Sequence, residues 1–108
     1  MSHKVRFIEP NVQYQNMKSE IDATIQDVLS RGDLVYRKDL KEFEQSLANF
    51  VGTKYAVGLN SGYHALHLSL LAAGIGTGDE VIVPGHTFVA SISAIVHVGA
   101  KPVLVDVD

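Results

Sequence analysis

The sequence contains no cysteine and no tryptophan, and only 3 of its 108 residues are proline. Without cysteine, disulfide bonds, thiolate nucleophiles and cysteine-ligated metal sites are excluded. A strong excess of either charge is also missing, because 12 acidic and 9 basic residues are scattered along the chain and give a net charge of −3. No basic cluster therefore indicates a nucleic acid or an anionic membrane surface as a partner.

Long apolar runs are missing as well. The longest apolar stretch runs from Leu66 to Ile75, about half of what a membrane-spanning helix needs. The first six residues lead into no apolar segment, so we do not expect a signal peptide. With 46% apolar and 19% charged residues, the composition is typical of a soluble globular domain, and we expect a cytoplasmic protein.

Residues 1–53 predict an irregular lead-in followed by two amphipathic helices. Residues 1–15 show no clear period, whereas apolar residues recur on one helical face over 17–29 and again over 40–51. Asp39 stands three residues before a glutamate, which is the spacing of a capping box at the start of the second helix. The expected stops of the two helices are Gly32 and Gly52.

From residue 54 the pattern changes to strand, helix, strand, helix, strand. The expected strands cover residues 55–59, 81–84 and 102–107, and the expected helices cover 65–73 and 88–98. Such alternation calls for parallel strands joined by helical crossovers. The strands are nearly all apolar, as when helices cover both faces of a sheet. The predicted fold class is therefore α/β.

The last expected strand is followed at once by the end of the sequence, at Asp108. Three short strands would leave two long open edges, which natural sheets usually protect. We therefore expect an incomplete domain, with a small complete three-stranded domain as the alternative.

Two loops are candidate binding elements because both follow the carboxyl end of an expected strand. In the first, Asn60–Leu66, a helix beginning at Gly62 would direct free N–H groups and the positive end of its dipole at a phosphate. Gly62 would let the anion approach the backbone. The alternative is an ordinary turn capped by Ser61 or Asn60.

In the second loop, Pro84–Ser91, Thr87 is the expected N-cap and Phe88 could lie against a flat ligand held by the first loop. The alternative for Phe88 is a plain core residue.

Together the two loops resemble those of the DegT/DnrJ/EryC1/StrS family, the pyridoxal-phosphate (PLP) dependent sugar aminotransferases of aminotransferase fold type I. The resemblance runs from about residue 7 to the end, and an ordered set of short stretches carries it. These stretches are Phe43-Glu44 with Phe50 and Gly52, Ala56-Val57, Ser61-Gly62 with Ala65-Leu66, Gly76-x-Gly78-Asp79-Glu80-Val81-Ile82-Val83-Pro84, Thr87-Phe88-Val89-Ala90-Ser91, and Gly99-Ala100-x-Pro102-Val103-x-Val105-Asp106.

The resemblance implies that residues 54–108 begin the PLP-binding large domain, with a mostly parallel sheet. The backbone amides of Tyr63 and His64 would hold the PLP phosphate, Gly62 would give it room, and Phe88 would stack on the pyridine ring. His86 beside it is a candidate substrate contact. Many members have threonine where this chain has Tyr63, so the hydroxyl contact of that threonine with the phosphate is lost or replaced. Some relatives that act on 3-keto sugars have a Gly-Leu-Asp-Ala-Leu loop instead. The loop from Gly62 to Leu66 is more similar to that loop than to the threonine-containing one.

The implied reaction moves an amino group from an amino-acid donor, glutamate, to a keto group of a nucleotide-linked sugar, in a homodimeric enzyme. By the same resemblance, the Schiff-base lysine and the acidic partner of the pyridine nitrogen lie beyond position 108. None of the lysines present, which are Lys4, Lys18, Lys38, Lys41, Lys54 and Lys101, can be assigned that role. We therefore expect this chain alone to be inactive. The family fold also implies that the first strand pairs with a later strand rather than with the second.

Two rival functions remain open: a non-catalytic module that binds a nucleotide or phosphate, and a pseudo-enzyme that serves only for dimer contacts. Gly74-x-Gly76-x-Gly78 is similar to a dinucleotide-binding motif, but it follows a helix and precedes a strand. His64 and His67 could share a helix face, yet no acidic or cysteine partner is near in sequence, and we expect no metal.

Overall fold

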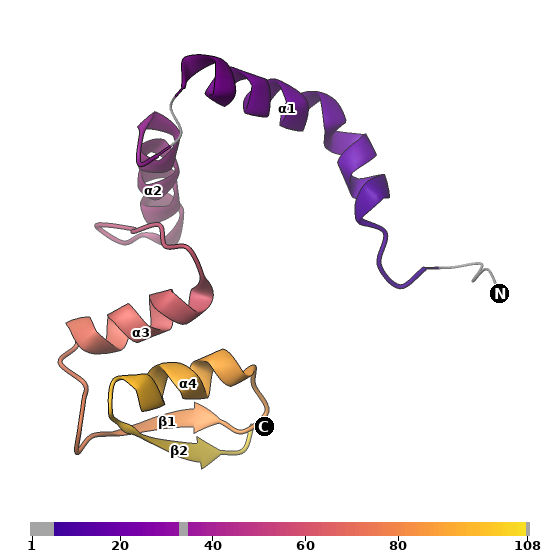
Figure 1. Ribbon diagram of the computed structural model, residues 1–108. Coiled ribbons are helices and arrows are strands. Elements are labelled where there is room, and N and C mark those ends of the chain that lie inside the picture. Colours follow the sequence, from indigo (N-terminus) through magenta and orange to yellow (C-terminus); the bar gives the residue numbers. More distant parts are fainter. Residues whose placement is uncertain (1–5, 33–34, 108) are drawn as a thin grey trace. The chain divides into compact units, whose positions relative to one another are not determined.

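The computed structural model describes residues 6–32 and 35–107 and divides the chain into two compact units, with the boundary between Ala56 and Val57 (Figure 1). Each unit is built from its own elements. The first contains two helices, α1 and α2, and the second contains the remaining helices and the strands.

Helix α1, Pro10–Arg31, starts earlier than the sequence predicted. The expectation of an irregular segment up to residue 15 was wrong, because Pro10 occupies the first turn of the helix. There its missing N–H needs no acceptor and its fixed φ already suits the helix. The C-terminal end is as predicted: Gly32 is left-handed, with φ of 65°, and its N–H donates to the carbonyl oxygens of the last turn.

Helix α2, Lys38–Val51, ends at Gly52, which is also left-handed and donates to the carbonyl oxygen of Ala48. The expected capping box at Asp39 is not formed, because the N-cap is Arg37 and no side chain caps the helix. The Asp39 carboxylate instead accepts a hydrogen bond of 2.7 Å from Nη2 of Arg31, at the end of α1. Asp39, which the sequence predicted to cap α2, thus forms an ion pair with Arg31 instead.

The second unit contains α3 (Gly62–Ala72), β1 (Glu80–Pro84), α4 (Val89–His97) and β2 (Lys101–Val105). Strands β1 and β2 pair in parallel, from Glu80 opposite Lys101 to Pro84 opposite Val105. Helix α4 is the crossover between them and contacts both strands, and α3 packs on α4 (Figure 1). The α/β class and the parallel pairing are therefore confirmed.

The core of this unit lies between α4 and the two strands. Val83 of β1, Ile95 of α4 and Ala100 at the entrance to β2 are buried together, and Leu70 of α3 packs against them. One apolar core thus holds both strands, α4 and α3 together. Because α3 and β1 are fixed by this core, so are the start of α3 and the loop after Pro84.

The strand expected at Tyr55–Leu59 is not part of the sheet, which has two strands within the described residues. A strand exists only where a neighbour takes up its backbone N–H and C=O groups, and residues 6–32 and 35–107 provide no such neighbour for this segment. The expectation of a strand at 55–59 was therefore wrong for the described residues, and the alternative of a complete three-stranded domain is not what the structure shows. That this segment does not pair with β1 agrees with what the resemblance implied.

Candidate functional site

The first turn of α3 is organised by Ser61. Its backbone is extended, and its Oγ accepts a hydrogen bond of 3.2 Å from the N–H of His64. The same oxygen lies 3.1 Å from Nδ1 of His64, so the hydroxyl can donate to that nitrogen while it accepts from the amide. Of the two caps that the sequence left open, Ser61 is the one formed. This cap fixes where the helix starts, at Gly62.

The N–H groups of the first helical turn point out of α3 because they have no acceptor within the helix. Ser61 accepts the one from His64, and those of Gly62 and Tyr63 lie just ahead of it in the chain. A Cβ built on Gly62 would meet no atom within 4 Å, so this corner of the molecule is open. The helix dipole adds a positive potential at the same place, and the turn can therefore receive an anion.

The second loop presents Phe88 to the outside. Phe88 itself is the N-cap position of α4, with an extended backbone and no side-chain cap. Thr87 was therefore the wrong N-cap; its Oγ1 lies 3.3 Å from Oγ of Ser91. The Phe88 side chain is 76% exposed, so the alternative of a core phenylalanine does not describe this chain. An exposed aromatic ring at a helix start is available to stack on a flat group.

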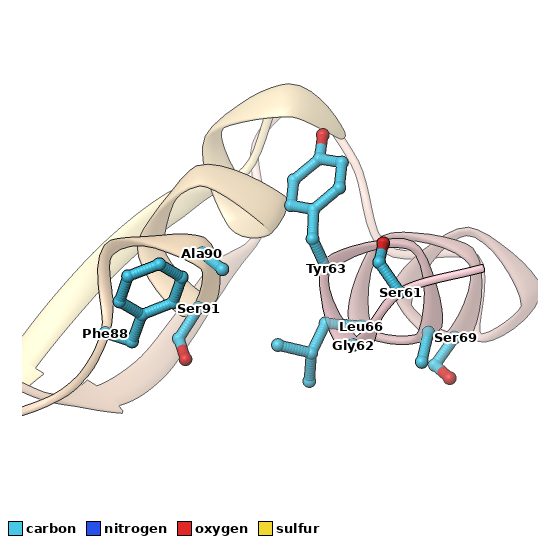
Figure 2. A pocket seen from close by; sticks show the side chains of 9 residues that line it. Ser61, Gly62, Tyr63, Leu66, Ser69, Phe88, Ala90 and Ser91 are labelled. Atoms are coloured by element: carbon cyan, nitrogen blue, oxygen red, sulfur yellow. The ribbon is translucent and has the colours of Figure 1, made fainter. Parts of the chain in front are cut away.

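These two loops meet at one pocket of about 680 Å³ (Figure 2), which is within the usual size range of small-molecule sites. Its wall combines apolar surface with three serine hydroxyls. The lining residues are Ser61, Gly62, Tyr63, Ala65, Leu66, Ser69, Phe88, Ala90 and Ser91. An anion-receiving helix start and an exposed ring on one pocket suit a ligand with a phosphate and a flat aromatic part.

Of the residues predicted from the sequence, Gly62, Tyr63 and Phe88 line this pocket and His64 and His86 do not. The His64 side chain turns back to Ser61, so only its backbone belongs to the helix start. His86 is exposed in the loop between β1 and α4.

The Tyr63 side chain is engaged elsewhere. Its hydroxyl forms a short hydrogen bond with Nδ1 of His97, the last residue of α4. Its ring stacks on His67, with centroids 5.8 Å apart and planes 15° apart. No local motif could link His97 to Tyr63, because 34 positions separate the two residues.

No lysine lines the pocket among the described residues. Lys101 begins β2 and pairs with Glu80 at the start of β1, with 2.7 Å between Nζ and Oε1, and this hydrogen bond raises the pKa of the lysine above its usual value. The remaining described lysines belong to the first unit; Lys4 lies outside the described residues. Within the described residues, the pocket lining therefore offers hydroxyl groups but no amine nucleophile.

Residues 6–32 and 35–107 contain neither a candidate metal site nor a candidate membrane span. No group of three or more histidine or acidic side chains is placed to hold a metal ion. No helix combines the length and apolar character needed to cross a membrane.

Comparison with known proteins gives a family match. The sequence model of the DegT/DnrJ/EryC1/StrS aminotransferase family matches residues 15–108. The UDP-2-acetamido-2-deoxy-3-oxo-D-glucuronate aminotransferase of Pseudomonas aeruginosa is 43% identical over 96% of this chain. The match covers 29% of that relative, so the chain spans less than a third of its length.

Solved structures agree with the sequence match. DesV of Streptomyces venezuelae, in complex with a ketimine intermediate, superposes with a TM-score of 0.92 at 42% identity, over 99% of this chain and 29% of that one. Spr1654 of Streptococcus pneumoniae in its PLP form superposes with a TM-score of 0.73 at 41% identity, over 81% of this chain and 23% of that one.

Proposed function

The chain belongs to the DegT/DnrJ/EryC1/StrS aminotransferase family, and we propose that it supplies part of the PLP site of an enzyme that converts a nucleotide-linked keto sugar to an amino sugar. The name of the Pseudomonas relative specifies a UDP-linked 3-oxo sugar. Together with the loop from Gly62 to Leu66, this supports a ketone at carbon 3 of the substrate.

The observation that carries the proposal is that Gly62 and Phe88 line one pocket. The open helix start at Gly62 fits a phosphate, and the exposed ring of Phe88 fits the face of a pyridine. When bound, PLP supplies the electron sink that amino-group transfer requires. The role of these residues is to hold and orient the cofactor.

We assign each proposed contact to a definite group of the chain. The phosphate contact is assigned to the Tyr63 amide, because the Tyr63 hydroxyl is hydrogen-bonded to His97. The His64 amide donates to Ser61, so a phosphate that takes this N–H must share it with the serine oxygen or displace it. We assign His86, exposed beside the site, to substrate contact.

We further propose that glutamate is the amino donor, that the complete enzyme is a homodimer, and that the lysine which binds PLP covalently belongs to a longer polypeptide. The described pocket contains no lysine. The 108-residue chain should then transfer no amino group from glutamate to a keto sugar nucleotide. A longer polypeptide that includes it should do so and should sediment as a dimer. Transfer by the chain alone would contradict this part of the proposal.

Binding can be tested on the chain itself by titration with PLP, with pyridoxal, which lacks the phosphate, and with uridine nucleotides. We expect PLP to shift the amide resonances of Gly62, Tyr63 and His64 and the ring resonances of Phe88. Phe88→Ala should weaken binding, whereas Phe50→Ala, at an exposed phenylalanine outside the pocket, should not. Saturation by a nucleotide without any response to PLP would instead support a nucleotide-binding module.

A further inference from the structure

Tyr63 has two parts with different partners. Its backbone N–H belongs to the first turn of α3, at the pocket. Its side chain is held by two histidines: the ring stacks on His67, and the edge-on ring of His97 lies with its centroid 5.8 Å away, at 85°. The hydroxyl completes the arrangement with its hydrogen bond to Nδ1 of His97.

This cluster joins the beginning of α3 to the end of α4. Tyr63 is the second residue of α3, and His97 is the last residue of α4. In Figure 2 the Tyr63 oxygen lies at the far end of a side chain that rises away from Gly62 and Leu66. The Tyr63 side chain thus links the first turn of α3 to α4 without occupying the place proposed for the phosphate. The amide of the same residue stays at the pocket.

His67 shows how closely the cluster is packed. Its Nδ1 is buried and has no hydrogen-bond partner among the described residues. A buried nitrogen without a partner is a cost, so the His67 ring is held there by its packing, which includes the stacked Tyr63 ring. Loss of the Tyr63 ring would remove this stacking contact, whereas loss of the hydroxyl alone would leave it in place.

We propose that Tyr63 is a positioning residue: through His97, its hydroxyl fixes the first turn of α3 so that the N–H groups of Gly62 and Tyr63 stay directed at a bound phosphate. The inference rests on the proposed function, since it assumes that PLP binds at this turn. It assigns to Tyr63 a role that differs from the direct phosphate contact of the threonine found in many relatives.

The test is Tyr63→Phe, which removes the hydroxyl and keeps the ring on His67. The dissociation constant for PLP should rise about two- to tenfold, which corresponds to one net hydrogen bond, while the weaker affinity for pyridoxal stays unchanged. His97→Ala should have the same effect, and the double variant should be no worse than either single one. His97→Asn keeps a polar atom near Nδ1 and should restore part of the affinity.

Tyr55→Phe is the matched control, because Tyr55 is exposed and outside the pocket; it should bind PLP like the unsubstituted chain. Equal affinity of Tyr63→Phe and the unsubstituted chain for PLP would overturn the inference and leave the proposed function standing. A parallel loss of pyridoxal affinity would also overturn it, since it would indicate general loosening of the unit. Failure of the unsubstituted chain to bind PLP would overturn both.

Discussion

Ser61 combines two duties that can be separated by substitution. It caps α3 and also lines the pocket. Ser61→Ala should lower the free energy of unfolding by about 1 kcal/mol, the usual worth of an N-cap, as measured by urea denaturation. Ser61→Asp keeps a capping oxygen and suits the helix dipole, so stability should be retained. Its charge, however, should repel a phosphate and abolish PLP binding.

Ser69→Ala serves as the control for the stability readout, since Ser69 lies within α3 and is not its N-cap. PLP binding by Ser61→Asp that equals binding by the unsubstituted chain would place the phosphate elsewhere.

Two features of the structure disfavour any side chain at position 99: the backbone conformation of Gly99 and its close contact with Thr77. Its φ is +84°, and a Cβ there would lie 2.8 Å from Oγ1 of Thr77. Gly74 is equally left-handed, with φ of +77°, but nothing lies within 4 Å of its Cβ position. Gly74→Ala should therefore cost about 1–2 kcal/mol from backbone strain alone, and Gly99→Ala should cost more.

Thermal unfolding of both variants measures this difference. Adding Thr77→Ala to Gly99→Ala should recover the part of the loss that is due to the clash, because it removes the Oγ1 atom. If Gly74→Ala and Gly99→Ala are equally destabilising, the contact with Thr77 carries no cost.

At the residue scale, the sequence could indicate that Ser61, Gly62 and Phe88 lie at one pocket, because each stands in a turn that directly follows an expected strand. It could not identify His97, because the bond from Tyr63 to His97 depends on how α3 and α4 pack. The family resemblance aligns Tyr63 with a threonine that contacts phosphate. It does not indicate that the Tyr63 side chain turns toward α4.

At the scale of elements, α1 carries a local charge cluster. Asp22 accepts from the Tyr14 hydroxyl at 2.8 Å and pairs with Lys18. The hydrogen bond from Lys18 and then that from Tyr14 hold the pKa of Asp22 below its ordinary value of 3.8. Folding lowers the pKa of Asp22, so the ion pair stabilises the helix fully at pH values above 3.8. This stabilisation is lost as the pH falls through the lower pKa of the folded state.

Circular dichroism should therefore show a loss of helix on acidification below pH 3.8. The part due to this pair should be absent in Asp22→Asn. Both side chains are about half exposed, so the effect should be small and should shrink in high salt. An unchanged acid titration in Asp22→Asn would show that the pair contributes nothing.

The elements were predictable where one residue type dictates the backbone. Gly32 and Gly52 end their helices because a left-handed position favours glycine. Helix starts were less predictable, since several residue types tolerate the N-cap; Asp39 and Thr87 were both misplaced for this reason. The segment Tyr55–Leu59 has the composition of a strand, but composition cannot supply the pairing partner that makes one.

At the scale of the whole molecule, the second unit leaves one side of its sheet uncovered. Val83 is 6% exposed on the side packed by α4, whereas its neighbour Ile82 is 71% exposed. Parallel sheets normally have both faces covered by other elements. The chain spans 29% of the Pseudomonas relative, and within the described residues of the second unit Ile82 stays exposed.

The exposure of Ile82 beside the buried Val83 leads to a prediction for the isolated chain. Exposed apolar surface binds hydrophobic dyes and promotes association, so the chain should enhance anilinonaphthalene sulfonate fluorescence and should sediment as larger species as its concentration rises. Ile82→Lys should reduce both effects and change the free energy of unfolding by no more than about 0.5 kcal/mol. Val83→Lys, one position further on, would bury an unpaired charge and should unfold the unit. A chain that stays monomeric at every concentration and binds no dye would mean that another segment covers Ile82 in solution.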